Sequence, residues 1–449
     1  MIPVTTPEEM AAIDGAAPEP VEVLIGRAGG ALARAALEML GGTYGRRVVV
    51  LVGKGNNGND GREAARRLRR RGVRVTEVDV GDHPRRLPDA DLVIDAAFGT
   101  GFHGDYDAPE ADAPVLACDI PSGVDGRTGT VAGRALSAER TVTFAALKPG
   151  LLLSPGAELA GRVGVADIGL DVSSASAWRV EASDVANWLP RRPRDTHKWA
   201  SACWVIAGSP GMTGAAHLAA RSAMRAGAGY VRLSSPGVDD DPLAPVEAVG
   251  VTLPEQGWAG VVLDEVERFR ALVVGPGLGV DEHTGPEVRR LAAEAPGPVV
   301  VDGDGLTALG KEVADLLRGR EVPAVLTPHD GEYERLRGGP VGDDRISAAR
   351  GLAADVGAVV LLKGSTTVVA RPDGRVLITD SGDARLATAG TGDVLSGIIA
   401  GLCAGGLGPF EAAAAGADLH GRAGRLGWRR GLVAGDLPDL VPAAIEELE

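Results

Sequence analysis

Residues 389–397 read AGTGDVLSG, and they open an apolar stretch that we predict to be helical to about residue 404. The glycines let backbone N–H groups approach a ligand closely, and the N-terminus of a helix favours a negatively charged phosphate. An Asp at this point is unfavourable beside phosphate unless it has a task, such as accepting a proton from a substrate hydroxyl. We therefore predict that Gly392 binds phosphate and that Asp393 is a catalytic base. The structural alternative is an Asp that only caps the helix.

Other turns of the second half have residues that suit the same site. A buried strand predicted at 358–364 ends in Lys363, which can meet a phosphate as a point charge. Lys is scarce in this chain, with 5 of the 46 basic residues, so a Lys at a strand end is informative. The remaining turns are GSPGMTGAA (208–216), GPGLG (275–279), VDGDGL (301–306) and LTPHDGE (326–332).

Short β-branched runs alternate with Ala-, Leu- and Arg-rich stretches along the chain, which indicates parallel sheets covered by helices. We predict an α/β protein of two three-layer αβα domains, the first of them Rossmann-like. Strands are predicted at 46–53, 73–80, 91–97, 114–120, 140–146, 161–172, 203–208, 230–235, 271–277, 297–303, 324–328, 358–364 and 366–370. Helices are predicted at 21–40, 61–71, 214–228, 285–295, 344–356 and 392–404. The stretch from about 172 to 196 has no period and contains a Pro/Arg cluster, so we expect domains at 1–180 and 181–449.

An amide-rich segment, GKGNNGNDG (53–61), follows a strand of the first half and precedes a predicted helix. Three of the chain's four Asn lie in it. Asn side chains supply neutral oxygens and amide donors together, which suits ribose hydroxyls or a weakly held monovalent cation. The segment is neither G-x-G-x-x-G nor a P-loop. We interpret it as a ligand-binding loop, and the structural alternative is a turn that tolerates left-handed backbone.

Two strands of the first half end in an Asp followed by a glycine turn, in VIDAAFGTG (93–101) and ACDIPSGVD (117–125). Ligands of open α/β sheets bind beyond the carboxyl ends of the strands, so Asp95 and Asp119 are expected beside the amide-rich loop. A lone Asp at a strand end is usually a helix cap or a loop hydrogen-bonder. Two of them converging with the loop favour a functional site.

The composition limits the class of protein. The 449 residues carry 46 Lys+Arg against 61 Asp+Glu, and the formal net charge of −15 argues against nucleic acid as a partner. No apolar run approaches the roughly 20 residues that span a bilayer, and the first residues lack the pattern of a secretion signal. Three widely separated Cys exclude a disulfide framework and a thiolate zinc site. We therefore expect a cytoplasmic protein with no membrane partner.

The motifs of the first half resemble the epimerase domain of NAD(P)H-hydrate repair enzymes, from about residue 5 to 170, including the later FAALKPGLLL. The resemblance implies that K+ meets Asn57, Asp95 and Ser122, and the placement of Asp119 at the sheet edge makes it the expected acid/base group. It implies substrate contacts at Asn56, Asn57, Gly58, Asn59, Asp60, Gly99, Thr100, Gly101, Phe102, His103, Gly104, Asp105 and Asp119. Asn59 departs from the family, which usually has a second glycine there.

The second half, from about 183 to 449, resembles the ADP-dependent NAD(P)H-hydrate dehydratase domain of the ribokinase-like superfamily. By this resemblance Ala215, Gly277 and His329 touch the hydrated dinucleotide, and Asp393 is the base on its C6 hydroxyl. The nucleotide, ADP or ATP, would be held by Lys363, Gly364, Ser365, Thr366, Thr367 and Gly392. Phosphoryl transfer normally needs Mg2+. Asp330 and Trp199 depart from the family, which has Pro and Gly there.

The expected function is repair of hydrated NADH and NADPH by a homo-oligomer. The first domain would interconvert the R and S hydrates at C6. The second would dehydrate the S hydrate and release phosphate and AMP when ADP is used. One alternative is a vitamin-type hydroxyl kinase fused to a dinucleotide-binding module. The other is a binding or regulatory module without activity, for which the departures at Asn59, Asp330 and Trp199 are the only signs.

Overall fold

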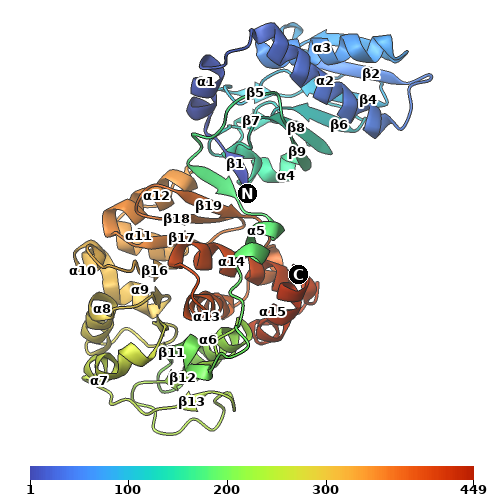
Figure 1. The fold of residues 1–449 in the computed structure, drawn as a ribbon. Helices are drawn as coiled ribbons and strands as arrows, with labels where there is room; N and C mark the ends of the chain where they lie inside the picture. Colours follow the sequence, from blue (N-terminus) through green and yellow to red (C-terminus); the bar gives the residue numbers. More distant parts are fainter. Residues whose placement is uncertain (449) are drawn as a thin grey trace. The chain divides into compact units, whose positions relative to one another are not determined.

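The computed structural model describes residues 1–448, and the chain divides into two compact units. The N-terminal unit is Ile2–Trp178, and the C-terminal unit is Arg179–Glu449 together with Met1. Each unit is built on its own sheet, parallel or largely parallel, with helices against it (Figure 1). Within the described residues no helix is both long enough and apolar enough to cross a membrane.

The N-terminal unit has a six-stranded sheet in the order β3-β2-β4-β6-β8-β9, with every neighbouring pair parallel. Its strands are β2 (Arg47–Val52), β3 (Arg74–Asp79), β4 (Leu92–Ala96), β6 (Val115–Cys118), β8 (Arg140–Phe144) and β9 (Arg162–Ala166). Its other elements are β1 (Ile2–Val4), the paired β5 (Tyr106–Asp107) and β7 (Gly133–Arg134), α1 (Pro7–Gly15), α2 (Val21–Leu40), α3 (Asn56–Arg70) and α4 (Gly156–Ala160). Because β2, β4 and β6 are neighbours, their carboxyl ends lie side by side.

The two faces of this sheet are covered differently. Helices α2 and α3 pack on one face, where Leu32, Val50 and Ile94 are fully buried. On the other face the apolar cluster is completed by side chains such as Leu87, from the chain after β3, and Tyr106 and Ala108, from the short strand β5 and the residue that follows it. One face of the sheet is therefore packed by helices, and the other is covered largely by loops.

In the C-terminal unit the sheet runs in the order β19-β18-β17-β16-β15-β14-β11-β12-β13, parallel from β17 to β13 and antiparallel at β17–β18 and β18–β19. The strands are β11 (Ala202–Ile206), β12 (Tyr230–Ser234), β13 (Val249–Gly250), β14 (Ala271–Val274), β15 (Val299–Val301), β16 (Val325–Leu326), β17 (Val359–Leu362), β18 (Thr367–Ala370) and β19 (Val376–Thr379); β10 (Ala177–Arg179) lies at the boundary of the units. The helices are α5 (Ala182–Trp188), α6 (Thr213–Arg225), α7 (Trp258–Glu265), α8 (Thr284–Glu294), α9 (Asp304–Leu309), α10 (Val313–Leu317), α11 (Asp330–Arg337), α12 (Arg345–Val356), α13 (Thr391–Ala404), α14 (Pro409–Leu426) and α15 (Leu437–Glu446).

Helix α13 is the central helix of this unit. From Val394 to Ala404 every residue is buried, and α13 packs against α6 and α14. Gly397 and Gly401 allow this close approach, because a Cβ at either position would meet a backbone carbonyl oxygen of α6. Figure 1 shows α6, α13 and α14 on one side of the sheet and α7 to α12 on the other. The glycine turn at the start of α13 is thus fixed by packing at the carboxyl ends of the parallel strands.

Two candidate active sites

The amide-rich segment forms the first turns of α3 rather than a loop before it. The sequence pattern predicted a helix from residue 61, but α3 begins at Asn56, with Gly55 as its N-cap. Gly53 and Gly58 permit this, because a Cβ on Gly53 would overlap the carbonyl oxygen of Ala97 and one on Gly58 would overlap that of Gly53. Asn59, the departure from the family pattern, turns its side-chain oxygen toward the guanidinium of Arg62 (3.4 Å). The N-terminus of α3 therefore lies directly against the carboxyl ends of β2 and β4.

The structure brings together two of the three residues predicted to bind K+ and leaves the third with free polar atoms. The hydroxyl of Ser122 donates to the Asp95 carboxylate at 2.6 Å, and the Ser122 backbone N–H donates to its other oxygen at 2.9 Å. Asp95 is fully buried, and burial raises its pKa despite these hydrogen bonds. Both polar side-chain atoms of Asn57 are buried without a hydrogen-bond partner among the described residues.

Asp119 lies in a buried network with a lysine that the sequence analysis did not assign. The ammonium of Lys148 donates to Asp119 (2.7 Å), to the hydroxyl of Thr143 (2.8 Å) and to the carbonyl of Phe144 (3.0 Å). Burial opposes ionisation of Asp119, but the Lys148 charge outweighs it and holds the Asp119 pKa below its usual value. Asp119 also has φ = 67°, a backbone conformation that is uncommon for a non-glycine residue and is often found at functional sites.

Asp60 is a second buried carboxyl group of this region. Its surroundings favour the neutral form, whereas those of Asp119 favour the charged form. Asp60 is 7% exposed and makes no ion pair within the described part of the chain. Burial, reinforced by the charges of Asp119 and Asp14, raises the pKa of Asp60 to about 8. At neutral pH the Asp60 side chain is therefore mostly protonated.

The loop from Gly99 to Asp105, which was predicted to contact the substrate, lies only partly against Asp119 and Asn57. The backbone N–H of Thr100 donates to Asp119 at 3.0 Å, and a Cβ on Gly99 would lie 3.2 Å from Asp119 Oδ2 and 3.3 Å from the side chain of Asn57. Phe102 packs on Phe98, with ring centroids 4.4 Å apart. The other four residues of the predicted loop contacts are exposed to solvent: Gly101, His103, Gly104 and Asp105.

The C-terminal site gathers at the carboxyl ends of three neighbouring strands and at the start of α13. Lys363 follows β17, and its ammonium lies 2.6 Å from the carboxylate of Asp302, which follows β15. The same ammonium is 3.8 Å from Glu332. A Cβ on Gly392 would lie 3.3 Å from the ammonium of Lys363 and 3.5 Å from Asp302, so the phosphate turn, the lysine and this carboxylate adjoin.

Asp393 stands in the first turn of α13 among these charges. Burial and the neighbouring Asp302 carboxylate raise its pKa, the Lys363 charge lowers it, and the result is about 7. A carboxyl with this pKa is close to half ionised at neutral pH, which is where a general base is most effective. For Glu332, burial likewise raises the pKa, against the Lys363 charge.

The remaining predicted nucleotide and substrate residues lie close to strand ends of the same unit. Gly277 adjoins Ala215, since a Cβ on Gly277 would lie 3.0 Å from that of Ala215. His329 is the N-cap of α11, and its Nδ1 accepts from the N–H groups of Gly331 (3.0 Å) and Glu332 (3.3 Å). The turn between β17 and β18 contains Gly364, Ser365 and Thr366, and Thr367 begins β18.

Both departures from the dehydratase pattern have a local structural explanation. Asp330 pairs with Arg345 (2.9 Å), and Arg345 also donates to the carbonyl of Lys363 (2.7 Å), so Asp330 supports the turn that ends β17. Trp199 stacks on Tyr230, with ring centroids 4.2 Å apart, and makes an edge contact with Phe269. These contacts give no support to a degraded site.

His420 on α14 is a further residue that the sequence analysis missed. It is 7% exposed, and its Nε2 has no hydrogen-bond partner. Burial and the charge of Lys363 lower its pKa to about 4, so its ring is neutral at physiological pH. No motif marks this histidine in the alanine-rich sequence around it, whereas Lys148 stands out as one of only five lysines.

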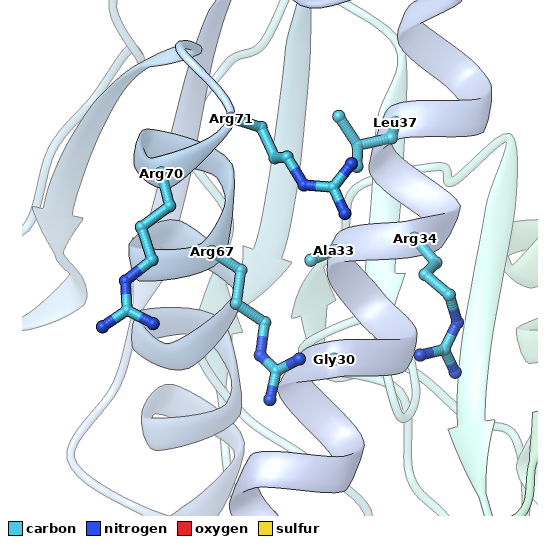
Figure 2. Close-up of a pocket in the computed structure, with 7 residues that line it drawn as sticks. All are labelled: Gly30, Ala33, Arg34, Leu37, Arg67, Arg70 and Arg71. Carbon is cyan, nitrogen blue, oxygen red and sulfur yellow. The ribbon is translucent and has the colours of Figure 1, made fainter.

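A groove of about 260 Å³ lies between α2 and α3 and is lined by Gly30, Ala33, Arg34, Leu37, Arg67, Arg70 and Arg71. Figure 2 shows Arg67 and Arg71 reaching between the two helices, while Arg34 and Arg70 point outward on either side. Arg67 is held by Glu63 (2.7 Å) and by the carbonyl of Gly26 (2.9 Å). Arginines in the last turn of α3 also complement the negative end of its dipole. None of the predicted site residues lines this groove.

Taken together, the sheets and their strand-end clusters define a two-domain α/β enzyme. Its C-terminal unit has a glycine turn beside Lys363 and a carboxyl with a pKa of about 7, and its N-terminal unit has a pair of buried carboxyls beside a helix N-terminus. Residues 203–446 match the family model described as NAD(P)H-hydrate dehydratase, and residues 21–86 and 77–150 match the one described as YjeF-related protein N-terminus. The chain belongs to the family of bifunctional NAD(P)H-hydrate repair enzymes.

Relatives of this family match most of the chain. The bifunctional NAD(P)H-hydrate repair enzyme of Moorella thermoacetica is 38% identical over 90% of this chain and 88% of its own length. The enzyme of Mycobacterium tuberculosis is 42% identical over 83% of this chain and 82% of its own length. The enzyme of Escherichia coli is 33% identical over 87% of this chain and 84% of its own length. Since the matches extend over both halves, a kinase fused to an unrelated module is not favoured.

Two solved structures are similar in fold to the C-terminal part. One is an ADP/ATP-dependent NAD(P)H-hydrate dehydratase from Bacillus subtilis, co-crystallised with ATP and Mg2+; it is 34% identical, has a TM-score of 0.54 and is matched over 60% of this chain and 98% of its own. The other is a ribokinase-like superfamily protein from Enterococcus faecalis, 23% identical, with a TM-score of 0.55 over 61% of this chain and 96% of its own. The second supports the fold alone.

Proposed function

We propose that this chain repairs hydrated NADH and NADPH in two steps, with residues 1–180 as the epimerase and 181–449 as the nucleotide-dependent dehydratase. The observation that carries the proposal is Asp393, a carboxyl with a pKa of about 7 in the phosphate-binding turn of α13, beside Lys363. A kinase-like turn with such a base suits phosphorylation of a hydroxyl. The names of the relatives indicate that the molecule with this hydroxyl is the hydrated nicotinamide nucleotide.

For dehydration, Asp393 takes the proton of the substrate's C6 hydroxyl. The hydroxyl oxygen attacks the terminal phosphorus of ADP, and AMP leaves. The C6–O bond of the phosphate ester then breaks, free phosphate leaves, and the proton on C5 passes to water, which restores the ring double bond. Lys363 and the N–H groups at Gly392 bind the phosphates and stabilise the charge that develops on them. His329, whose Nδ1 is occupied as an acceptor and whose Nε2 lies 3.5 Å from a carboxylate oxygen of Glu332, would contact the dinucleotide through its exposed ring face.

Mg2+ is proposed to arrive with the nucleotide. The described residues contain no group of three or more His, Cys, Asp or Glu side chains arranged to hold a metal. Mg2+ keeps several waters and binds through one or two carboxylates plus substrate phosphates, which the acids around Lys363 permit. Bound there, it would offset phosphate charge during transfer.

K+ is proposed to bind in the N-terminal site at Asn57, Asp95 and Ser122. Asn57 has a buried side-chain oxygen without a partner, and the carboxylate of Asp95 with the hydroxyl of Ser122 adds two further oxygens of the kind that a hard cation prefers. This donor set fits a monovalent cation, whose charge would compensate the buried carboxylate. A cytoplasmic location and a homo-oligomeric state stay predictions.

The decisive experiment supplies the full-length chain with purified R and S hydrates, ADP and Mg2+, and follows the absorbance of the reduced nicotinamide together with released phosphate. Both epimers are expected to be consumed completely, with AMP and free phosphate as products. Consumption of the S epimer alone would mean an inactive first domain. A stable phosphorylated product would support the kinase alternative, and no consumption of either epimer would reject the proposal.

Replacing K+ by choline at constant ionic strength is expected to lower the epimerisation rate, because the buried Asp95 carboxylate loses its counterion. Epimerisation is measured by chromatographic separation of the hydrates without ADP. Ser122→Ala is expected to abolish the K+ response, whereas Ser137→Ala, which changes an exposed serine of the same unit, retains it. Equal rates in K+ and choline would exclude a functional K+ site.

A further inference from the structure

We propose that the epimerase site divides its proton transfers between two carboxyl groups: Asp60 is the proton donor, and Asp119, held as a carboxylate by Lys148, is the proton acceptor. This inference rests on the proposed epimerase function and adds to it two further roles, those of Asp60 and Lys148. Asp60 acts on the substrate as a catalytic residue. Lys148 acts only through Asp119 and is a positioning residue.

The role of Lys148 follows from how completely its ammonium is used. The side chain is 2% exposed, and its three N–H donors have three acceptors, on Asp119, Thr143 and Phe144. Lys148 therefore has no donor left for a substrate. Its hydrogen bond and that of Thr143 (3.0 Å) go to Oδ1 of Asp119, while Oδ2 receives the N–H of Thr100. Asp119 is kept charged and oriented, and it has no proton of its own to give.

Asp60, unlike Asp119, lies in surroundings that favour its protonated form. It lies on α3 after β2, whereas Asp119 follows β6, so the two carboxyls come from strands on either side of β4 and its Gly99 turn. No cation faces Asp60 within the described chain, and the charged groups that act on it are Asp119 and Asp14, both of which favour its neutral form. The adjacent thiol of Cys118 is buried and stays neutral because burial raises its pKa. In enzymes, two carboxyl groups whose surroundings favour opposite protonation states usually serve as the acid and the base.

The chemistry balances with these two groups and water. Asp60 protonates the C6 hydroxyl, the ring nitrogen lone pair forms a double bond to C6, and the C6–O bond breaks to release water. Water adds to the other face of C6, the nitrogen regains its lone pair, and the proton of the attacking water passes to Asp119. Return of one proton from Asp119 to Asp60 restores the starting state, and Lys148 favours that return because it stabilises the Asp119 carboxylate.

The test is the pH profile of kcat/KM for epimerisation in the full-length chain. The wild-type profile is expected to fall as the pH rises through about 8, because Asp60 loses its proton. Asp60→Asn is expected to lose this alkaline fall and to be slower by roughly 100- to 10,000-fold, the usual range for a general acid. Lys148→Met is expected to shift the acidic rise of the profile to higher pH, because Asp119 then lacks its counterion.

Dehydration of the S hydrate, measured on the same samples, reports whether each variant still has a working second domain. Asp89→Asn changes an exposed Asp of the N-terminal unit and is expected to keep the wild-type profile. Circular dichroism and thermal unfolding identify a Lys148→Met chain that has not folded, in which case Asp60→Asn, a change of nearly equal volume, decides alone. An unchanged alkaline limb in Asp60→Asn overturns the inference. A wild-type chain that does not epimerise at all overturns instead the proposed function.

Discussion

The Asp393→Asn variant is expected to dehydrate the S hydrate about 100- to 10,000-fold more slowly than the wild type, with epimerisation unchanged. Asn has nearly the same shape and fits the first turn of α13, where the N-cap is Gly390, but it does not accept the proton of the C6 hydroxyl. The loss is expected in kcat, since the phosphate contacts of Lys363 and Gly392 remain. Stopped assays of released phosphate measure dehydration, and chromatography of the hydrates measures epimerisation.

The pH dependence gives the same prediction a second readout. Asp393 works in its ionised form, so wild-type kcat/KM for dehydration is expected to rise as the pH rises through about 7, where its pKa lies. The variant lacks this group and is expected to show no such rise. Asp315→Asn, on the exposed side of α10, is the matched control and retains the wild-type rate and profile. A variant that keeps the rise would assign the base to another residue. Loss of both activities would indicate one shared site.

The sequence was most informative where chemistry needs a short, local motif. The glycine turn before Asp393, the strand that ends in Lys363 and the two strand-end aspartates could all be recognised, because strand, turn and helix follow one another within a few residues. The ends of the elements were less predictable. Residue 61 was the predicted start of α3, since Asn and Gly are poor helix formers, yet packing of Gly58 against Gly53 starts the helix at Asn56.

Elements stabilised mainly by tertiary packing were missed. Helix α14 has so many alanines and glycines that no apolar stripe stands out, but its buried face packs on α13 through contacts such as Gly416 against Ile399. Strand β19 is only four residues long and pairs antiparallel with β18, which itself pairs antiparallel with β17, and the parallel pattern from β17 to β13 predicts neither pairing. Both depend on neighbours that are distant in sequence or different in direction.

The charge states of the carboxyls were beyond any sequence pattern. Asp60 and Asp119 look alike as acids in glycine-rich segments, yet one is neutral and the other ionised at pH 7. The difference comes from Lys148, which is 29 residues from Asp119 along the chain and reaches it because β6 and β8 are adjacent in the sheet. Assignment of acid and base therefore required the three-dimensional neighbours.

The second large effect is expected from Lys363→Met, which should both destabilise the C-terminal unit and weaken nucleotide binding. Asp302 is 2% exposed, and its carboxylate lies 2.6 Å from the lysine. Removing one partner of a buried ion pair leaves the other charge uncompensated and typically costs about 3–5 kcal/mol. For a domain of this size the melting temperature is expected to fall by roughly 10 °C. Differential scanning calorimetry measures stability, and isothermal titration calorimetry measures ADP affinity. Lys311→Met, an exposed lysine of the same unit, is the control.

A double variant separates the two effects of Lys363. In Lys363→Met/Asp302→Asn the buried charge is gone together with its counterion, so most of the lost melting temperature is expected to return. ADP affinity is not expected to return, because the lysine is the cation proposed to meet the phosphates and no other residue of the turn replaces its charge. Recovery of both stability and ADP binding would mean that Lys363 only neutralises Asp302. Recovery of neither would mean that the lysine stem, rather than its charge, holds the end of β17. The predicted outcome, stability without binding, is the one that assigns Lys363 to the nucleotide.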